Sequence, residues 1–114
     1  MSKLPLNIQS AINEFVRECK KKLGSRLKRV ILYGSYARGD YNNSSDIDIL
    51  VLTDYKPGEF YSVLKKISNI TYDIELEYDV ILTPLINNLY NFNNSLESIP
   101  FYTNIQKEGV ILGE

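Results

Sequence analysis

The sequence predicts a single domain of α/β type, in which α-helices and β-strands alternate. Its 114 residues fit one compact domain, residues 1–114, with 44% hydrophobic residues to fill a core. Two long segments repeat apolar residues every three or four positions, as amphipathic helices do. Short runs rich in β-branched residues lie between and after these segments, as strands do.

The first helix is predicted over Pro5–Leu23. Its apolar side comprises Ile8, Ala11, Ile12, Phe15, Val16, Cys19 and Leu23. Pro5 suits the first turn of a helix, and Gly24 suits the end of one. Because Cys19 lies on the apolar side, its thiol is predicted to be packed rather than reactive.

Three strands are predicted. The first is residues 29–33, and the second is residues 47–53, which are apolar at nearly every position apart from Asp48. A nearly continuous apolar run is typical of a strand covered on both faces. The third strand is residues 79–86, where Pro84 indicates the edge of a sheet or a bulge.

A second long helix is predicted over residues 60–76. Its apolar spacing comprises Phe60, Val63, Leu64, Ile67, Ile70 and Ile74. A last helix is predicted with Ser98 as cap, Pro100 in its first turn and Gly109 as its end. That helix would direct Phe101, Tyr102 and Ile105 inward. Residues 87–98 are rich in Asn and only weakly periodic, so they receive no assignment.

The composition excludes several kinds of site and partner. The chain has no His and one Cys, so Ser-His or Cys-His nucleophiles and zinc sites of imidazole or thiolate type are excluded. Any metal would be a hard ion bound by oxygen. The formal net charge of -1 argues against a nucleic-acid partner. The sequence shows no signal peptide and no apolar run of membrane-spanning length, so a cytoplasmic protein without a membrane partner is expected.

The segment Leu32–Val51, LYGSYARGDYNNSSDIDILV, contains the candidate site. Gly34 and Ser35 end one predicted strand, ten residues follow, and Asp46 and Asp48 begin the next. Because alternate residues of a strand point to the same face, the two carboxylates can bind one Mg²⁺ ion or a pair of them.

The glycine and serine of this segment suit a phosphate. Gly34 lets the backbone approach a ligand, and the hydroxyl and N–H groups at Ser35 can bind phosphate oxygens. Arg38 would reach the same site if residues 35–38 form a helical turn. Together these groups suit phosphoryl or nucleotidyl transfer. A Walker loop is excluded, because Asp40 stands where that motif needs Lys.

The segment resembles the signature of polymerase-beta-type nucleotidyltransferases: Gly-Ser, ten residues, then Asp-x-Asp. The short chain also resembles the minimal nucleotidyltransferases that form the MNT antitoxin half of HEPN/MNT toxin-antitoxin pairs. This resemblance implies a short mixed sheet backed by helices, two Mg²⁺ ions, and ATP or another nucleoside triphosphate as donor. It implies that Asp46 and Asp48 are catalytic metal ligands. Gly34 and Ser35 would bind the triphosphate, assisted by Arg38.

The family pattern also has a third carboxylate, on the strand after the second long helix. Asp79 is predicted to be this catalytic metal ligand, because it opens the predicted third strand. Glu77 is the second choice. Asp73 and Glu75 fall on the predicted helix, where a solvated surface position is the simplest interpretation.

The resemblance implies transfer of AMP from ATP to a hydroxyl, for example a tyrosine of a partner HEPN toxin, with the chain acting as the antitoxin. One alternative is a nucleotide-binding antitoxin that neutralises its partner by contact alone. Another is a small-molecule nucleotidyltransferase, although that class usually has an additional helical domain. The sequence leaves self-association open.

Overall fold

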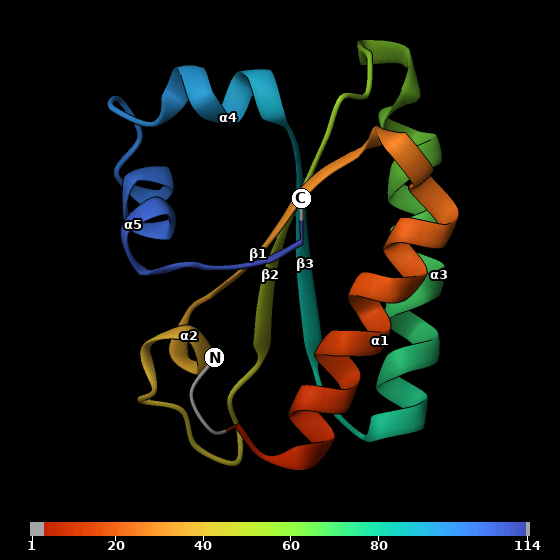
Figure 1. Cartoon of the computed structure of the whole chain (residues 1–114), viewed down its shortest axis with the longest axis vertical. Coiled ribbons are helices and arrows are strands. Elements are labelled where there is room, and N and C mark those ends of the chain that lie inside the picture. Colours follow the sequence, from red (N-terminus) through yellow and green to blue (C-terminus); the bar gives the residue numbers. More distant parts are fainter. Residues whose placement is uncertain (1–3, 114) are drawn as a thin grey trace.

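The computed structural model describes residues 4–113, which form a four-stranded sheet with helices on both faces (Figure 1). The helices are α1 (Leu6–Leu23), α2 (Ser35–Arg38), α3 (Phe60–Tyr78), α4 (Leu89–Ser95) and α5 (Pro100–Glu108), with 3₁₀ turns at Gly24–Arg26 and Pro57–Glu59. The strands are β1 (Leu27–Tyr33), β2 (Ile47–Thr53), β3 (Leu82–Asn88) and β4 (Val110–Gly113). They lie in the order β3-β2-β1-β4.

The sheet is mixed, as expected. Strand β2 is antiparallel to β1 and parallel to β3, and β1 is antiparallel to β4. Pro84 lies in β3, which is an edge strand, so the expectation from proline is confirmed. The bounds predicted for β2 agree with the structure at both ends.

The apolar run of β2 is covered on both faces, as predicted. Helices α1 and α3 lie on one side of the sheet, and α4 and α5 lie on the other (Figure 1). The odd-numbered residues of β2 from 47 to 51 belong to the larger core with α1 and α3. The smaller core on the other face comprises Ile31, Leu50, Leu52, Phe92 and Ile105.

The end of α3 differs from the prediction. The helix continues to Tyr78, and β3 begins at Leu82 rather than at Asp79. Asp79 adopts the left-handed conformation (φ 53°, ψ 53°), and its N–H donates to the carbonyl of Glu75. Asp79 therefore ends a helix instead of opening a strand. Left-handed residues are usually glycine at this position, so an aspartate is not an ordinary stop signal.

The segment after β3 contains structure that the sequence pattern did not indicate. Residues 89–95 form α4, and the side chain of Asn88 caps it by accepting from the N–H groups of Tyr90 and Asn91. Helix α5 begins at Pro100, but its cap position is Ile99 rather than Ser98. Strand β4 then completes the sheet beside β1.

Helix α1 packs as predicted. Cys19 is fully buried on its apolar side, and burial together with Glu18 raises the pKa of the thiol to about 12. The thiol is therefore protonated at neutral pH, as a packing residue is. Within residues 4–113, no helix combines the length and the apolar character needed to cross a bilayer.

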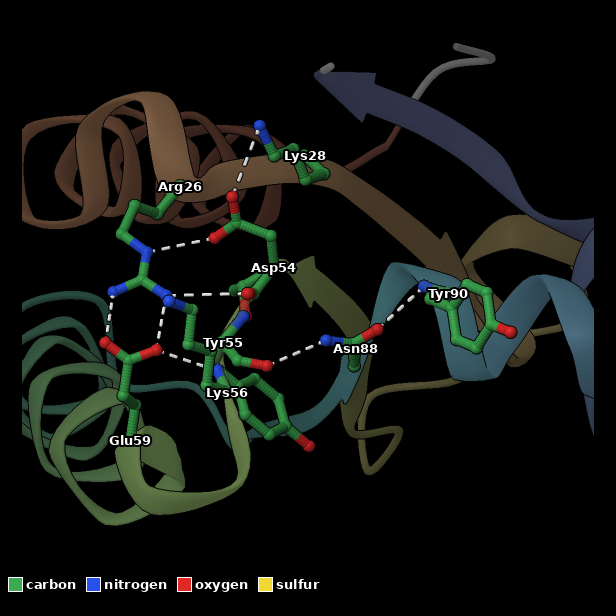
Figure 2. A network of polar contacts seen from close by, with 9 residues as sticks. Arg26, Lys28, Asp54, Tyr55, Lys56, Glu59, Asn88 and Tyr90 are labelled. Atoms are coloured by element: carbon green, nitrogen blue, oxygen red, sulfur yellow. Dashed lines mark hydrogen bonds and ion pairs between the residues drawn. The ribbon is translucent and has the colours of Figure 1, made fainter.

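A network of ion pairs joins the start of β1 to the segment that follows β2 (Figure 2). The guanidinium of Arg26 binds both carboxylate oxygens of Glu59, at 2.7 and 2.6 Å, and donates through Nε to Asp54 at 2.9 Å. Glu59 also accepts from the backbone N–H of Lys56 at 2.7 Å. The hydrogen bonds from Arg26 and Lys56 lower the pKa of Glu59 to about 2.

Asn88 ties β3 into the same end of the sheet. Its Nδ2 donates to the carbonyl of Tyr55 at 2.8 Å, while its Oδ1 accepts from the N–H of Tyr90 at 2.8 Å (Figure 2). One side chain thus connects the loop after β2, the end of β3 and the start of α4.

The Arg26–Glu59 pair should make stability depend on acid pH. Because the pKa of Glu59 is about 2 in the folded chain and 4.5 ordinarily, its stabilising effect is complete above pH 4.5 and is lost as pH falls towards 2. We expect Glu59→Gln to lower the free energy of unfolding at pH 7 and to differ little from wild type near pH 2. Urea titrations at pH 7, 4 and 2 measure this, with the exposed Glu97→Gln as control. If Glu59→Gln lowers the free energy of unfolding equally at pH 7, 4 and 2, the ion pair with Arg26 is not the cause.

Candidate active site

The candidate site lies at the other end of the sheet, where β1 ends and β2 begins. The antiparallel register places Tyr33 opposite Asp48, so Gly34 follows directly beside that carboxylate. Gly34 has φ 78°, and a Cβ at this position would lie 2.2 Å from Oδ2 of Asp48. Both the backbone conformation and the space therefore require glycine here.

A cavity of about 430 Å³ opens at this place. It is lined by Tyr33, Gly34, Ser35, Arg38, Asp48, Phe101, Asn104, Ile105 and Glu108. The size falls within the usual range for small-ligand sites. Four residues that the sequence predicted as functional, Gly34, Ser35, Arg38 and Asp48, thus share one cavity.

The short helix α2 arranges the predicted phosphate-binding residues. The carbonyl of Gly34 accepts from the N–H groups of Ala37 and Arg38, and Gly39 ends the turn in the left-handed conformation. Residues 35–38 therefore form the helical turn that brings Arg38 to the site. The first N–H groups of such a turn have no acceptor within the helix, so those of Ser35 and Tyr36 suit an anion.

Arg38 connects α2 to α5 across the mouth of the cavity. Its guanidinium lies 3.2 Å from Oδ2 of Asp40 and 3.5 Å from Oε2 of Glu108. These partners are partly exposed, so the two ion pairs are weak in water and a phosphate can compete for the guanidinium.

Of the two predicted metal-ligating aspartates, Asp48 lines this cavity and Asp46 does not. Asp46 immediately precedes the strand and is exposed, while Asp48 is half-buried. On the neighbouring strand, the parallel register places Thr83 opposite Asp48, and Oγ1 of Thr83 donates to Oδ1 of Asp48 at 2.6 Å. Sequence reasoning missed Thr83, because only the pairing of β2 with β3 reveals its position.

The carboxylates predicted to complete the site lie elsewhere. Asp79 lines a second cavity, of about 330 Å³, together with the loop residues 43–45 and the start of α1. The carboxyl of Glu77 hydrogen-bonds with Glu14 of α1, which raises the pKa of Glu77. Among residues 4–113, no cluster of three or more Asp, Glu, Cys or His side chains has the arrangement of a metal site. The catalytic role of Asp79 stays a prediction.

Helix α5 forms the wall of the cavity opposite α2, which the sequence did not indicate. Phe101 was predicted to point inward, but it is 47% exposed and packs edge-on against Tyr33, with ring centroids 5.7 Å apart. Burial and the neighbouring Asp48 raise the pKa of Tyr33 to about 12. The Tyr33 phenol is therefore protonated at neutral pH.

The donor atoms at the start of β2 suit a hard divalent cation. The carboxylates of Asp46 and Asp48 and the hydroxyl of Thr83 all offer oxygen, the ligand that Mg²⁺ prefers. Beside them, the cavity offers the amides of α2 and the guanidinium of Arg38 for negatively charged oxygens. The arrangement can therefore hold a metal-bound phosphate compound.

Comparisons with known proteins agree with this chemistry. The family model described as "Nucleotidyltransferase domain" matches residues 12–111. The chain is 36% identical over 107 residues to "Putative protein adenylyltransferase MJ0604" of Methanocaldococcus jannaschii, covering 94% of this chain and 99% of the relative. It is 40% identical over 81 residues to a protein of the same organism with the corresponding name, MJ0141, covering 71% of this chain and 80% of the relative.

Solved structures share the fold. A crystal structure from Sulfolobus solfataricus, described as a putative nucleotidyltransferase, superposes with a TM-score of 0.57 and 22% identity, covering 100% of this chain and 92% of that one. A chain of a complex described as a toxin-antitoxin with AMP-PNP superposes with a TM-score of 0.54 and 17% identity, covering 87% of this chain and 70% of that one.

The contact between Gly34 and Asp48 predicts different effects at two glycines with positive φ. Gly34→Ala and Gly39→Ala should each cost about 1–3 kcal/mol for a strained backbone. Only a Cβ at Gly34 meets a side chain, because nothing lies within 4 Å at Gly39. We expect Gly34→Ala to lose more stability in urea unfolding and, alone of the two, to weaken Mg²⁺ binding measured by calorimetry. Equal effects of both variants on Mg²⁺ binding would disprove the contact.

Proposed function

This chain belongs to the nucleotidyltransferase domain family, and from that we propose that it transfers AMP from ATP to a hydroxyl group of a partner protein. One observation carries the proposal: Ser35, Arg38 and Asp48 line the same cavity. Such a cavity places groups that bind phosphate beside a carboxylate that suits a divalent cation.

Each residue has a distinct task in this proposal. The amides at the start of α2 and the guanidinium of Arg38 bind the triphosphate. Asp46 and Asp48 hold Mg²⁺, which supplies neutralisation of the charge that develops on the phosphates. Thr83 fixes the orientation of the Asp48 carboxylate through its hydrogen bond.

The reaction is an in-line displacement at the α-phosphorus. The oxygen of the acceptor hydroxyl forms a bond to that phosphorus, and the bond between the α-phosphorus and the α–β bridging oxygen breaks. Pyrophosphate leaves, and the hydroxyl proton passes to a base or to water. No histidine is required for these steps, which agrees with the composition of the chain.

For the acceptor, we propose a tyrosine of a HEPN-type helical toxin, with this chain as its antitoxin. Two relatives carry the name protein adenylyltransferase, and a complex of similar fold is described as a toxin-antitoxin with AMP-PNP. These names support a protein acceptor and a toxin partner.

A second candidate function is neutralisation by contact with nucleotide bound but little transfer. One observation favours it: the residue of β3 that faces Asp48 is Thr83, a neutral side chain, at a position where a carboxylate would complete a metal site.

Calorimetry with Mg²⁺-ATP and a labelling assay test the proposed transfer. We expect saturable, Mg²⁺-dependent ATP binding by wild type. The double variant Asp46→Asn with Asp48→Asn should abolish this binding, because the metal loses both carboxylates. Glu97→Gln, exposed and remote in sequence, is the control. With a purified HEPN-type toxin as acceptor and ATP labelled at the α-phosphate, we expect label on the toxin from wild type and not from the double variant. ATP binding without label would favour neutralisation by contact, and binding unchanged in the double variant would refute the proposed site.

Two variants test whether Thr83 of β3 or Asp79 at the end of α3 occupies the position that completes the metal site. Because Thr83 is in register with Asp48, we expect Thr83→Asp to tighten Mg²⁺ binding by about tenfold, since a third carboxylate joins the site. Unchanged transfer by Asp79→Asn would refute the predicted catalytic role of Asp79. If Asp79 is instead the third catalytic carboxylate, Asp79→Asn will lower transfer by about 10² to 10⁴ while nucleotide affinity is kept.

A further inference from the structure

Helix α3 has two apolar faces, and the core uses only one of them. Its buried residues are Val63, Ile67, Ile70 and Ile74. A second set, which we call the outer stripe, comprises Tyr61, Leu64, Tyr72 and Leu76, with 74%, 39%, 63% and 68% of each residue exposed. At about 100° per residue, the outer stripe spans an arc of about 120° nearly opposite the buried face. Its length along the helix is about 22 Å.

The outer stripe is unusual for a helix that covers a sheet. Such a helix normally presents charged and polar residues to water on the side away from the core. Leu64 belongs to the apolar spacing that predicted a single inward face, yet the structure leaves it partly exposed. Two large apolar side chains near each end of the helix indicate that another surface covers this face.

The charges within and beside the outer stripe identify the occupant. Lys65 and Lys66 lie in the first half of α3, whereas Asp73 and Glu77 lie in the second half. An identical helix placed antiparallel would bring the basic half of each copy against the acidic half of the other. We propose that two copies of this chain pair through α3 in an antiparallel, two-fold symmetric dimer.

One crossing point satisfies the apolar and the charged contacts together. If the helices cross between Ser68 and Asn69, Tyr61 of one copy lies level with Leu76 of the other. The pairs Leu64–Tyr72 and Lys65–Asp73 are each one residue from level, about 1.5 Å along the helix axis, so their side chains can still meet. Each contact occurs twice because of the symmetry. Ser68, at the crossing, is small enough to let the helices approach closely.

The dimer leaves the catalytic cavity open. Residues of α5 line the cavity. Helix α3 lies on the opposite side of the sheet from α5 (Figure 1). Self-association is therefore independent of nucleotide binding. One helix face of this length gives a small interface, so the dimer should be reversible.

Sedimentation of the full chain over a series of concentrations tests the dimer. We expect reversible self-association that the double variant Tyr72→Gln with Leu76→Gln weakens by at least about 30-fold, because every apolar pair of the interface loses one partner. Glutamine preserves helix propensity, and both positions are exposed, so the fold should be retained. Circular dichroism checks this.

A charge exchange tests the antiparallel orientation. Lys65→Asp alone and Asp73→Lys alone should each weaken association by about tenfold, because like charges then meet twice. The double variant, Lys65→Asp with Asp73→Lys, should restore it. Lys22→Asp on α1 is the exposed control. A chain that stays monomeric at all concentrations, or association that the stripe variants leave unchanged, overturns the dimer. Failure of the double variant to restore association overturns its orientation, and stripe variants that abolish only toxin binding assign the face to the toxin.

Discussion

Successive side chains of β2 must point to opposite faces of the sheet, and this constraint decides where the acidic groups of the site lie. On one face the strand packs against α1 and α3 along its length. On the other face Leu50 and Leu52 are covered by α4 and α5, while Asp48, on the same side, is left at the uncovered start. A strand buried on both faces can thus carry a carboxylate only where a helical layer ends.

Contacts at the opposite end of the sheet keep β2 in register with its neighbours. A shift of β2 by one residue against its neighbours would turn Asp48 into the larger core and Ile49 towards the cavity. The Arg26 network fixes the entry of β1 relative to the exit of β2, and Asn88 fixes the exit of β3 (Figure 2). Polar contacts that lie far from the chemistry therefore maintain the register on which it depends.

Local patterns in the sequence predicted the parts of the fold that local forces determine. The bounds of β2 and the buried face of α1 follow from apolar spacing, and Gly34, Ser35, Arg38 and Asp48 share a cavity as their positions at strand ends indicated. Asp79 was assigned to the wrong element because a left-handed aspartate ends α3, where glycine is the usual signal. The contributions of Thr83 and α5 depend on pairing between distant segments, which periodicity does not contain. The Asn88 cap of α4 is a missed feature with a local signal, since Asn before a helix is a common cap.

The cavity is assembled from segments that a ribosome makes at very different times. The Gly-Ser turn and the two aspartates belong to the first half of the sequence, whereas the facing wall is α5 and the neighbour of β1 on its outer edge is β4. Until residues 100–113 have been synthesised, β1 has an unpaired edge, which is the kind of edge that invites association with other chains. The nascent chain thus carries the complete signature long before it has a place to hold a ligand.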